Sequence, residues 1–90
     1  MIRRKPVEDG VAVTFVLADD LDGQVSVVGD FNDWTPGAHL LQRRSNGTLS
    51  VTVTMPAGRR IHFRYLASGG RWFNDPEADA HDGQGSLLEL

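Results

Sequence analysis

The chain has 90 residues, carries a net charge of −3 and contains no cysteine. This length suits one domain. The negative charge argues against a general nucleic-acid binder, which needs a basic face. Because there are no thiols, disulfides and thiolate metal sites are excluded. The N-terminus lacks the apolar segment of a signal peptide, and no apolar run is long enough to cross a membrane. We therefore expect a cytoplasmic protein in a reducing compartment.

Residues 1–10 are polar and contain Pro6 and Gly10, so we expect a flexible lead-in before a single domain over residues 11–90. In that domain, short stretches in which apolar and polar residues alternate predict β-strands. The expected strands cover residues 11–18, 24–29, 39–43, 48–55, 60–67, 71–73 and 86–90.

Turn signals separate these strands. The stretch from Asp19 to Gly23 is expected to turn the chain, and Asn46-Gly47 predicts a hairpin with a type I′ turn. The acidic stretch over residues 74–84 is expected to be a solvated loop, and no window shows the period of a helix. About seven short strands with turn signals roughly every 8–12 residues predict an all-β fold, an antiparallel β-sandwich.

Catalytic and metal chemistry find little support in the residues. The three histidines are scattered, no nucleophile signature occurs, and most acidic residues lie in turns, where they solvate the surface. Asp19, Asp20 and Asp22 lack the spacing and the final glutamate of a calcium loop. We expect no catalytic residue, no metal site and no cofactor.

The two tryptophans, Trp34 in a loop and Trp72 at a hairpin, stand outside the regular core alternation. Each could cap an open end of the sandwich, or it could stack against a sugar ring, whose polarised C–H groups suit an aromatic face. Arg64 is expected on the outward face of its strand, where it would be a hydrogen-bond donor beside an aromatic platform.

Four segments occur in an order and spacing that resemble carbohydrate-binding module family 48. They are Val25 to Trp34 (VSVVGDFNDW), Pro56-Ala57-Gly58, Phe63-Arg64-Tyr65 and Trp72 to Pro76 (WFNDP). This is the early-set, isoamylase N-terminal type of domain, and the chain is also similar to the glycogen-binding domain of the AMP-activated protein kinase β subunit. The resemblance covers about residues 11–90 and implies an immunoglobulin-like sandwich that binds α-1,4-linked glucan.

The resemblance also implies roles for individual residues. Trp34 and Trp72 match stacking tryptophans, Arg64 takes the place of a sugar-contacting lysine, and Asn74 joins them as a carbohydrate-binding residue. Phe31 matches an inward aromatic anchor, and Asp75-Pro76 matches a structural turn. The stretch from His81 to Ser86 departs from the kinase domain, whose Leu, Thr and Asn contacts have no clear counterpart in it.

These observations support two functions. The first is a non-catalytic module that binds an α-glucan polysaccharide or a malto-oligosaccharide. The alternative is a protein-interaction or regulatory module associated with glycogen-metabolising enzymes of the glycoside hydrolase family 13 type. An enzyme in its own right is a third reading, for which the sequence places no nucleophile–base or carboxylate pair. No nucleic-acid or membrane partner is expected.

Overall fold

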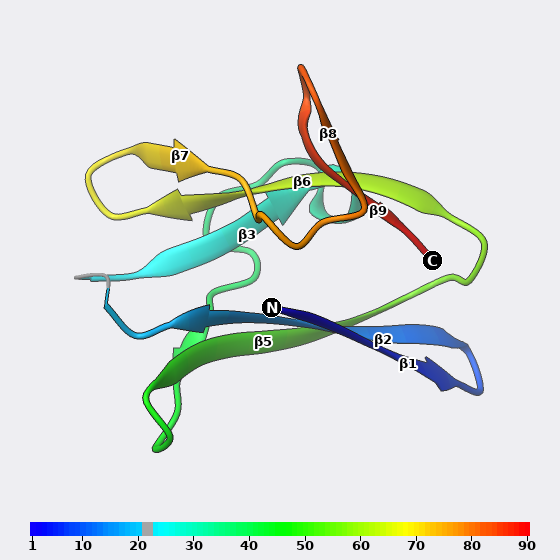
Figure 1. Ribbon diagram of the computed structural model, residues 1–90, viewed down its shortest axis with the longest axis horizontal. Helices are drawn as coiled ribbons and strands as arrows, with labels where there is room; N and C mark the ends of the chain where they lie inside the picture. The colour runs from blue at the N-terminus through cyan, green and yellow to red at the C-terminus, as the bar shows by residue number, and fades with distance from the viewer. Residues whose placement is uncertain (21–22) are drawn as a thin grey trace.

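The computed structural model describes residues 1–20 and 23–90, which form two antiparallel β-sheets packed face to face. The first sheet has the strand order β1-β2-β5-β4, and the second has the order β3-β6-β9-β8, with β7 also paired to β6. Figure 1 shows the two sheets as separate layers. The expected all-β antiparallel sandwich is therefore confirmed.

The strands of the first sheet follow the alternation in the sequence, except at the N-terminus and over residues 39–43, where only Gln42–Arg43 forms a strand and Leu40 instead bridges to Ser26. The strands are β1 (Ile2–Val7), β2 (Gly10–Ala18), β4 (Gln42–Arg43) and β5 (Thr48–Met55). The second sheet contains β3 (Val25–Gly29), β6 (Arg60–Ala67), β7 (Arg71–Phe73), β8 (Ala80–Asp82) and β9 (Gly85–Glu89). One short 3-10 helix, η1 (Asp30–Asn32), follows β3.

The flexible lead-in expected over residues 1–10 is instead largely a strand. Ile2–Val7 pairs along its whole length with β2, from Ile2 opposite Phe15 to Val7 opposite Gly10. A polar strand containing Pro6 is tolerated because β1 is an edge strand, whose outer side needs no backbone donor. Its side chains are mostly exposed, which is why no apolar alternation marked it.

Two turns also differ from expectation. The acidic stretch over residues 74–84 is not one loop, because β8 forms within it and pairs with β9. The hairpin at Asn46-Gly47 forms, but a left-handed φ is found at Gly47 (81°) and not at Asn46. This matches a three-residue loop that ends in a left-handed glycine rather than a type I′ turn. The turn expected over residues 19–23 includes 21 and 22, which lie outside the described residues.

The core lies between the sheets and is centred on aromatic rings. Phe15 of β2 contacts Phe63 and Tyr65 of β6, with ring centroids 5.1 and 6.4 Å apart. Phe31 of η1 stacks on Phe15, with ring centroids 6.0 Å apart. This contact with the core confirms Phe31 as the inward anchor of its turn. Packed aromatic pairs of this kind add about 1 kcal/mol each beyond the area that they bury.

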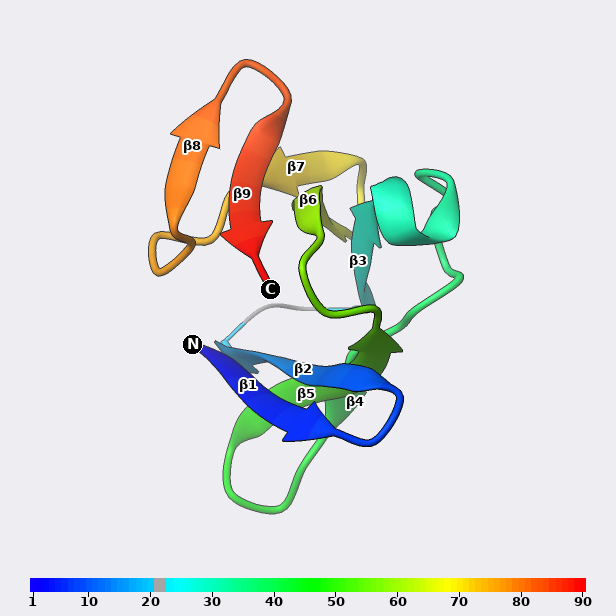
Figure 2. The ribbon, with the colours of Figure 1, turned by 90° about the vertical axis from the view of Figure 1, so that its right-hand side faces the viewer.

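The outer strands of the second sheet share one side of β6. The first half of β6 pairs with β9 (Arg60 opposite Glu89), and its second half pairs with β7 (Ala67 opposite Arg71). Because β7 and β9 both pair with β6 on the same side, the chain that leads from β7 to β8 passes between these two strands. Figure 2 shows the β8–β9 hairpin on one side of β6 and the η1 turn on the other.

Candidate functional site

The outer face of the second sheet carries Arg64 and Trp72, two of the four residues that were expected to bind sugar. Alternation along β6 buries Phe63 and Tyr65 and turns Arg64 and Leu66 outward. Trp72 of β7 lies opposite Leu66, so it stands one strand away on this same face. The structure therefore brings Arg64 and Trp72 to one surface, as expected.

Trp72 presents a large exposed apolar surface. Trp72 is 48% exposed although it belongs to a paired strand. Its neighbour Phe73 instead turns inward, and the ring centroids of Phe73 and Tyr65 lie 5.2 Å apart. Asn74 follows β7 directly and is also exposed. An exposed tryptophan followed by an exposed amide offers a stacking surface with a hydrogen-bonding group nearby.

Trp34 lies on the segment that follows β3 and η1, and β3 borders β6 on the side opposite to β7 and Trp72. Trp34 is 39% exposed, and its backbone has a left-handed φ of 55°, as does that of Asp33. Its amide donates to the carbonyl of Gly29 at 2.8 Å. Two consecutive non-glycine residues in this region cost conformational energy, so the local hydrogen bonds must hold the turn in place.

The Asn32 side chain supplies these hydrogen bonds. Its Oδ1 accepts from the amide of Gly29 at 3.0 Å, and its Nδ2 donates to the carbonyl of Val27 at 3.0 Å. The same Nδ2 lies 3.0 Å from Nδ1 of His39. The side chain thus ties the end of β3 to the returning segment, which fixes the backbone that carries Trp34.

Arg64 is held by the turn between β8 and β9. Its Nη2 donates to the carbonyl of Gly83 at 2.9 Å, and its Nε is buried with no hydrogen-bond partner among the described residues. The side chain lies against Gly85, where an added Cβ would come within 2.7 Å of the Arg64 Cγ. Arg64 therefore anchors this turn, a role that the sequence did not indicate.

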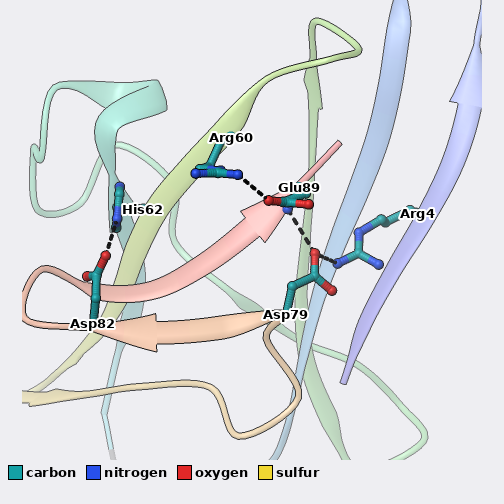
Figure 3. Close-up of polar contacts among 6 residues, drawn as sticks. All are labelled: Arg4, Arg60, His62, Asp79, Asp82 and Glu89. Atoms are coloured by element: carbon teal, nitrogen blue, oxygen red, sulfur yellow. Dashed lines mark hydrogen bonds and ion pairs between the residues drawn. The ribbon is translucent and has the colours of Figure 1, made fainter.

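A hydrogen bond and an ion pair fasten the β8–β9 hairpin to its neighbours (Figure 3). His62 Nε2 lies 2.8 Å from Asp82 Oδ2, and the pKa of Asp82 is lowered, first by this contact and then by the amide of Gln84. Arg60 pairs with Glu89 at 2.7 Å. The hairpin is thus held on the β6 side by these polar contacts, of which the exposed ion pair contributes little by itself.

Asp79 connects the two sheets. It accepts from Arg4 of β1 at 2.8 Å and from the backbone amide of Glu89 at 2.8 Å. The pKa of Asp79 is lowered, chiefly by the Glu89 amide and then by Arg4. A carboxylate between β1 and β9 therefore links the edge of the first sheet to the second.

Within the acidic stretch over residues 74–84, which was expected to be solvated, Asp75 is buried. Its carboxylate accepts from the Tyr65 hydroxyl at 2.6 Å and from the Glu77 amide at 2.8 Å. Its own amide donates to Ser86 Oγ at 2.9 Å, and its carbonyl accepts from His81 Nε2 at 2.6 Å. Every polar atom of Asp75 has a partner, as a buried charge requires, which agrees with the structural turn expected at Asp75-Pro76.

A surface pocket of about 310 Å³ borders the outer face next to Trp72, and sequence reasoning missed it. We call it the side pocket. It lies between β3, the end of β6 and the segment 36–40. Its lining residues are Gln24, Ser26, Pro36, Gly37, Leu40, Leu66, Ala67 and Ser68. No local pattern could have indicated it, because its walls come from three separate segments.

Within residues 1–20 and 23–90, no group of three His, Asp or Glu side chains is placed to hold a metal ion. In the same part of the chain, no helix has the length and apolar character needed to cross a membrane.

Comparison with known proteins shows partial similarity to much longer enzymes. The chain is 40% identical over 57 residues to the 1,4-alpha-glucan branching enzyme of Salinibacter ruber, a match that covers 61% of this chain and 9% of that enzyme. It is 39% identical over 67 residues to the 1,4-alpha-glucan branching enzyme of Deinococcus radiodurans, covering 73% of this chain and 9% of that enzyme. No family model matches the chain. Most of this chain is therefore similar to a small part of each of these branching enzymes.

Proposed function

We propose that this chain is a non-catalytic α-glucan-binding module that stacks sugar rings on Trp34 and Trp72. The observation that carries the proposal is the placement of exposed apolar side chains. Among the residues that the structure describes, both tryptophans are exposed large hydrophobic residues: Trp72 on β7 and Trp34 on the segment that follows η1. Exposed tryptophan rings are enriched at binding sites, because they offer a large apolar surface together with a polar N–H group.

The chemistry of these side chains suits an uncharged polyhydroxylated ligand. Tryptophan rings present an electron-rich surface to sugar C–H groups, and Asn74 adds an amide group that can bind hydroxyls. The names of the two similar enzymes specify a 1,4-alpha-glucan, and the sequence resembles a family of glucan-binding modules. These lines of support point to the same ligand class.

The experiment is a titration of the chain with maltoheptaose, followed by tryptophan fluorescence. Because the sequence has two tryptophans and both belong to the proposed site, any change in emission reports on this site. We expect binding in the micromolar to millimolar range and a loss of about tenfold in Trp34→Ala or Trp72→Ala, by analogy with the stacking of bases on aromatic rings. Calorimetry measures the affinities of the variants independently of fluorescence.

Val7→Ala is the matched control, because Val7 is a similarly exposed apolar residue (38%) on β1 of the other sheet. It should bind maltoheptaose like the unmodified chain. The absence of a response at millimolar sugar would refute the proposal, as would unchanged affinity in both tryptophan variants.

The second candidate is a module that docks on a glycogen-metabolising enzyme. It is favoured by the engagement of Arg64 with Gly83, which leaves fewer donors for sugar hydroxyls. It is also favoured by the similarity to a short part of each branching enzyme. Size-exclusion chromatography with a 1,4-alpha-glucan branching enzyme, with and without excess glycogen, separates the two functions. A complex that survives excess glycogen, in a chain that does not bind maltoheptaose, would favour docking.

A further inference from the structure

The side pocket has walls that are fixed by hydrogen bonds. The segment over residues 39–41 runs beside β3: Val27 donates to the carbonyl of His39 at 3.0 Å, and Leu41 donates to that of Val25 at 2.8 Å. Ser26 forms an isolated β-bridge with Leu40 between these two contacts. Binding pockets for small ligands are usually formed before the ligand arrives, and this pairing meets that condition.

The turn at Pro36-Gly37 lies over Ser26 of β3 and borders the open side pocket there. The amide of Gly37 donates to Ser26 Oγ at 3.1 Å, and Gly37 has a left-handed φ of 83°. Since Ser26 accepts this hydrogen bond, its own hydroxyl hydrogen remains available as a donor. Ser26 therefore holds the turn and belongs to the lining of the side pocket.

The lining of the side pocket matches an uncharged ligand with both C–H and hydroxyl groups. The eight lining residues in the described part of the chain are all uncharged. Pro36, Leu40 and Leu66 supply apolar surface, while Gln24 and Ser26 supply the polar groups. A volume of about 310 Å³ lies at the small end of the range for ligand sites, so the pocket suits one small unit rather than an oligosaccharide.

Leu66 connects the side pocket to the proposed stacking surface. It lines the pocket and lies directly opposite Trp72 on the neighbouring strand, while Ser26 lies opposite it on the other side. Neighbouring strands lie about 4.8 Å apart, so a sugar unit in the pocket and one on Trp72 would be neighbours. A glucan chain that crosses from Trp72 over Leu66 meets the wall formed by the segment 36–40.

We propose that the side pocket holds the terminal glucosyl unit of an α-glucan chain whose preceding units stack on Trp72. The wall at Pro36-Gly37 stops the chain, so an end enters the pocket where a continuous or cyclic chain does not. Leu40 and Gln24 are then residues that determine specificity for chain ends. This inference rests on the proposed function, because the pocket adds one subsite to that surface.

The test compares maltoheptaose with β-cyclodextrin, the linear and the cyclic heptamer of α-1,4-linked glucose. Calorimetry is performed with the unmodified chain, with Leu40→Ala and with Gln24→Ala. We expect each variant to bind maltoheptaose about three- to tenfold more weakly and to bind β-cyclodextrin as the unmodified chain does. Trp72→Ala should weaken both sugars, because both stack on that ring.

Both pocket residues are exposed enough to be replaced without opening the core, and melting temperatures check that each variant is folded. Val7→Ala again serves as the control, with both affinities unchanged. Equal losses for the two sugars, or no loss for either, would overturn the chain-end pocket while leaving the glucan-binding function in place. Failure of the unmodified chain to bind either sugar would instead overturn the proposed function.

Discussion

The hydroxyl of Tyr65 donates to the carboxylate of Asp75 at 2.6 Å, and both side chains are completely buried. Tyr65 belongs to the central strand β6, whereas Asp75 belongs to the segment between β7 and β8. This contact ties the exit of β7, which carries Trp72, to the middle of the core. The Tyr65 ring also packs against Phe15, Phe63 and Phe73, so its hydroxyl has a fixed position.

Tyr65→Phe should destabilise the chain by about 3 kcal/mol. The substitution keeps the ring but leaves the buried Asp75 carboxylate without one of its donors, and the cost of an unpaired buried charge exceeds that of a lost neutral hydrogen bond. Equilibrium unfolding in urea measures the change. Thr52→Ala provides the comparison, because it removes a hydroxyl contact to Thr14 at 2.9 Å on the exposed surface. That change should cost less than about 0.5 kcal/mol, and similar values for the two variants would contradict the role given to Asp75.

The same contact predicts a characteristic alkaline transition. Burial, followed by the hydrogen bond and negative charge of Asp75, raises the pKa of Tyr65 far above its ordinary value of 10.0. The group therefore contributes stability at pH values below 10, and this contribution is lost as the pH rises above 10. Tyr65 is the single tyrosine of the sequence, so tyrosinate absorbance reports on it alone. We expect the absorbance to rise together with the loss of β-sheet circular dichroism; a rise near pH 10 in the folded chain would disprove the prediction.

Gly85→Ala should destabilise the chain much more than Gly47→Ala. Both glycines have a left-handed φ, of 124° and 81°, but a Cβ at residue 47 meets nothing within 4 Å. At residue 85 it would come within 2.8 Å of the Phe63 carbonyl as well as the Arg64 side chain. We expect a loss of about 1 kcal/mol for Gly47→Ala and about 3 kcal/mol or more for Gly85→Ala. Urea unfolding measures both, and equal losses would show that Arg64 and the β8–β9 turn are not closely packed.

Acid should weaken the contact between the sheets at Asp79. The pKa of Asp79 is lowered in the folded chain, first by the Glu89 amide and then by Arg4, so its contribution to stability is present above the ordinary value of 3.8. The contribution is lost as the pH falls below 3.8 through the lower folded-state pKa. We therefore expect stability to fall less between pH 5 and pH 2 in Asp79→Asn than in the unmodified chain. The midpoints of urea unfolding across this pH range measure the difference between the two chains. High salt should reduce this difference, because it screens the attraction between Asp79 and Arg4. Identical pH profiles would exclude Asp79 as a contributor.

Local patterns in the sequence were sufficient for strands β2, β5 and β6 and for the position, but not the type, of the turn between β4 and β5. Thr48–Met55 and Arg60–Ala67 form strands with the expected bounds, because an alternation with a period of two places one set of side chains in the core. The family resemblance, rather than periodicity, indicated Phe31 as an inward anchor. The same alternation placed Arg64 on the outer face, since a strand leaves no other direction for it.

The tertiary structure alone decided the features that depend on distant partners. β1 is a strand because β2 offers it an edge, and Asp75 is buried because Tyr65, Ser86 and His81 meet it there. The anchoring of Arg64 by Gly83 and the walls of the side pocket likewise join segments that are far apart in sequence. Periodicity reports which face of a strand is apolar, but it carries no information on which strands become neighbours. Pairing between strands therefore determined which side chains met at the proposed glucan-binding surface.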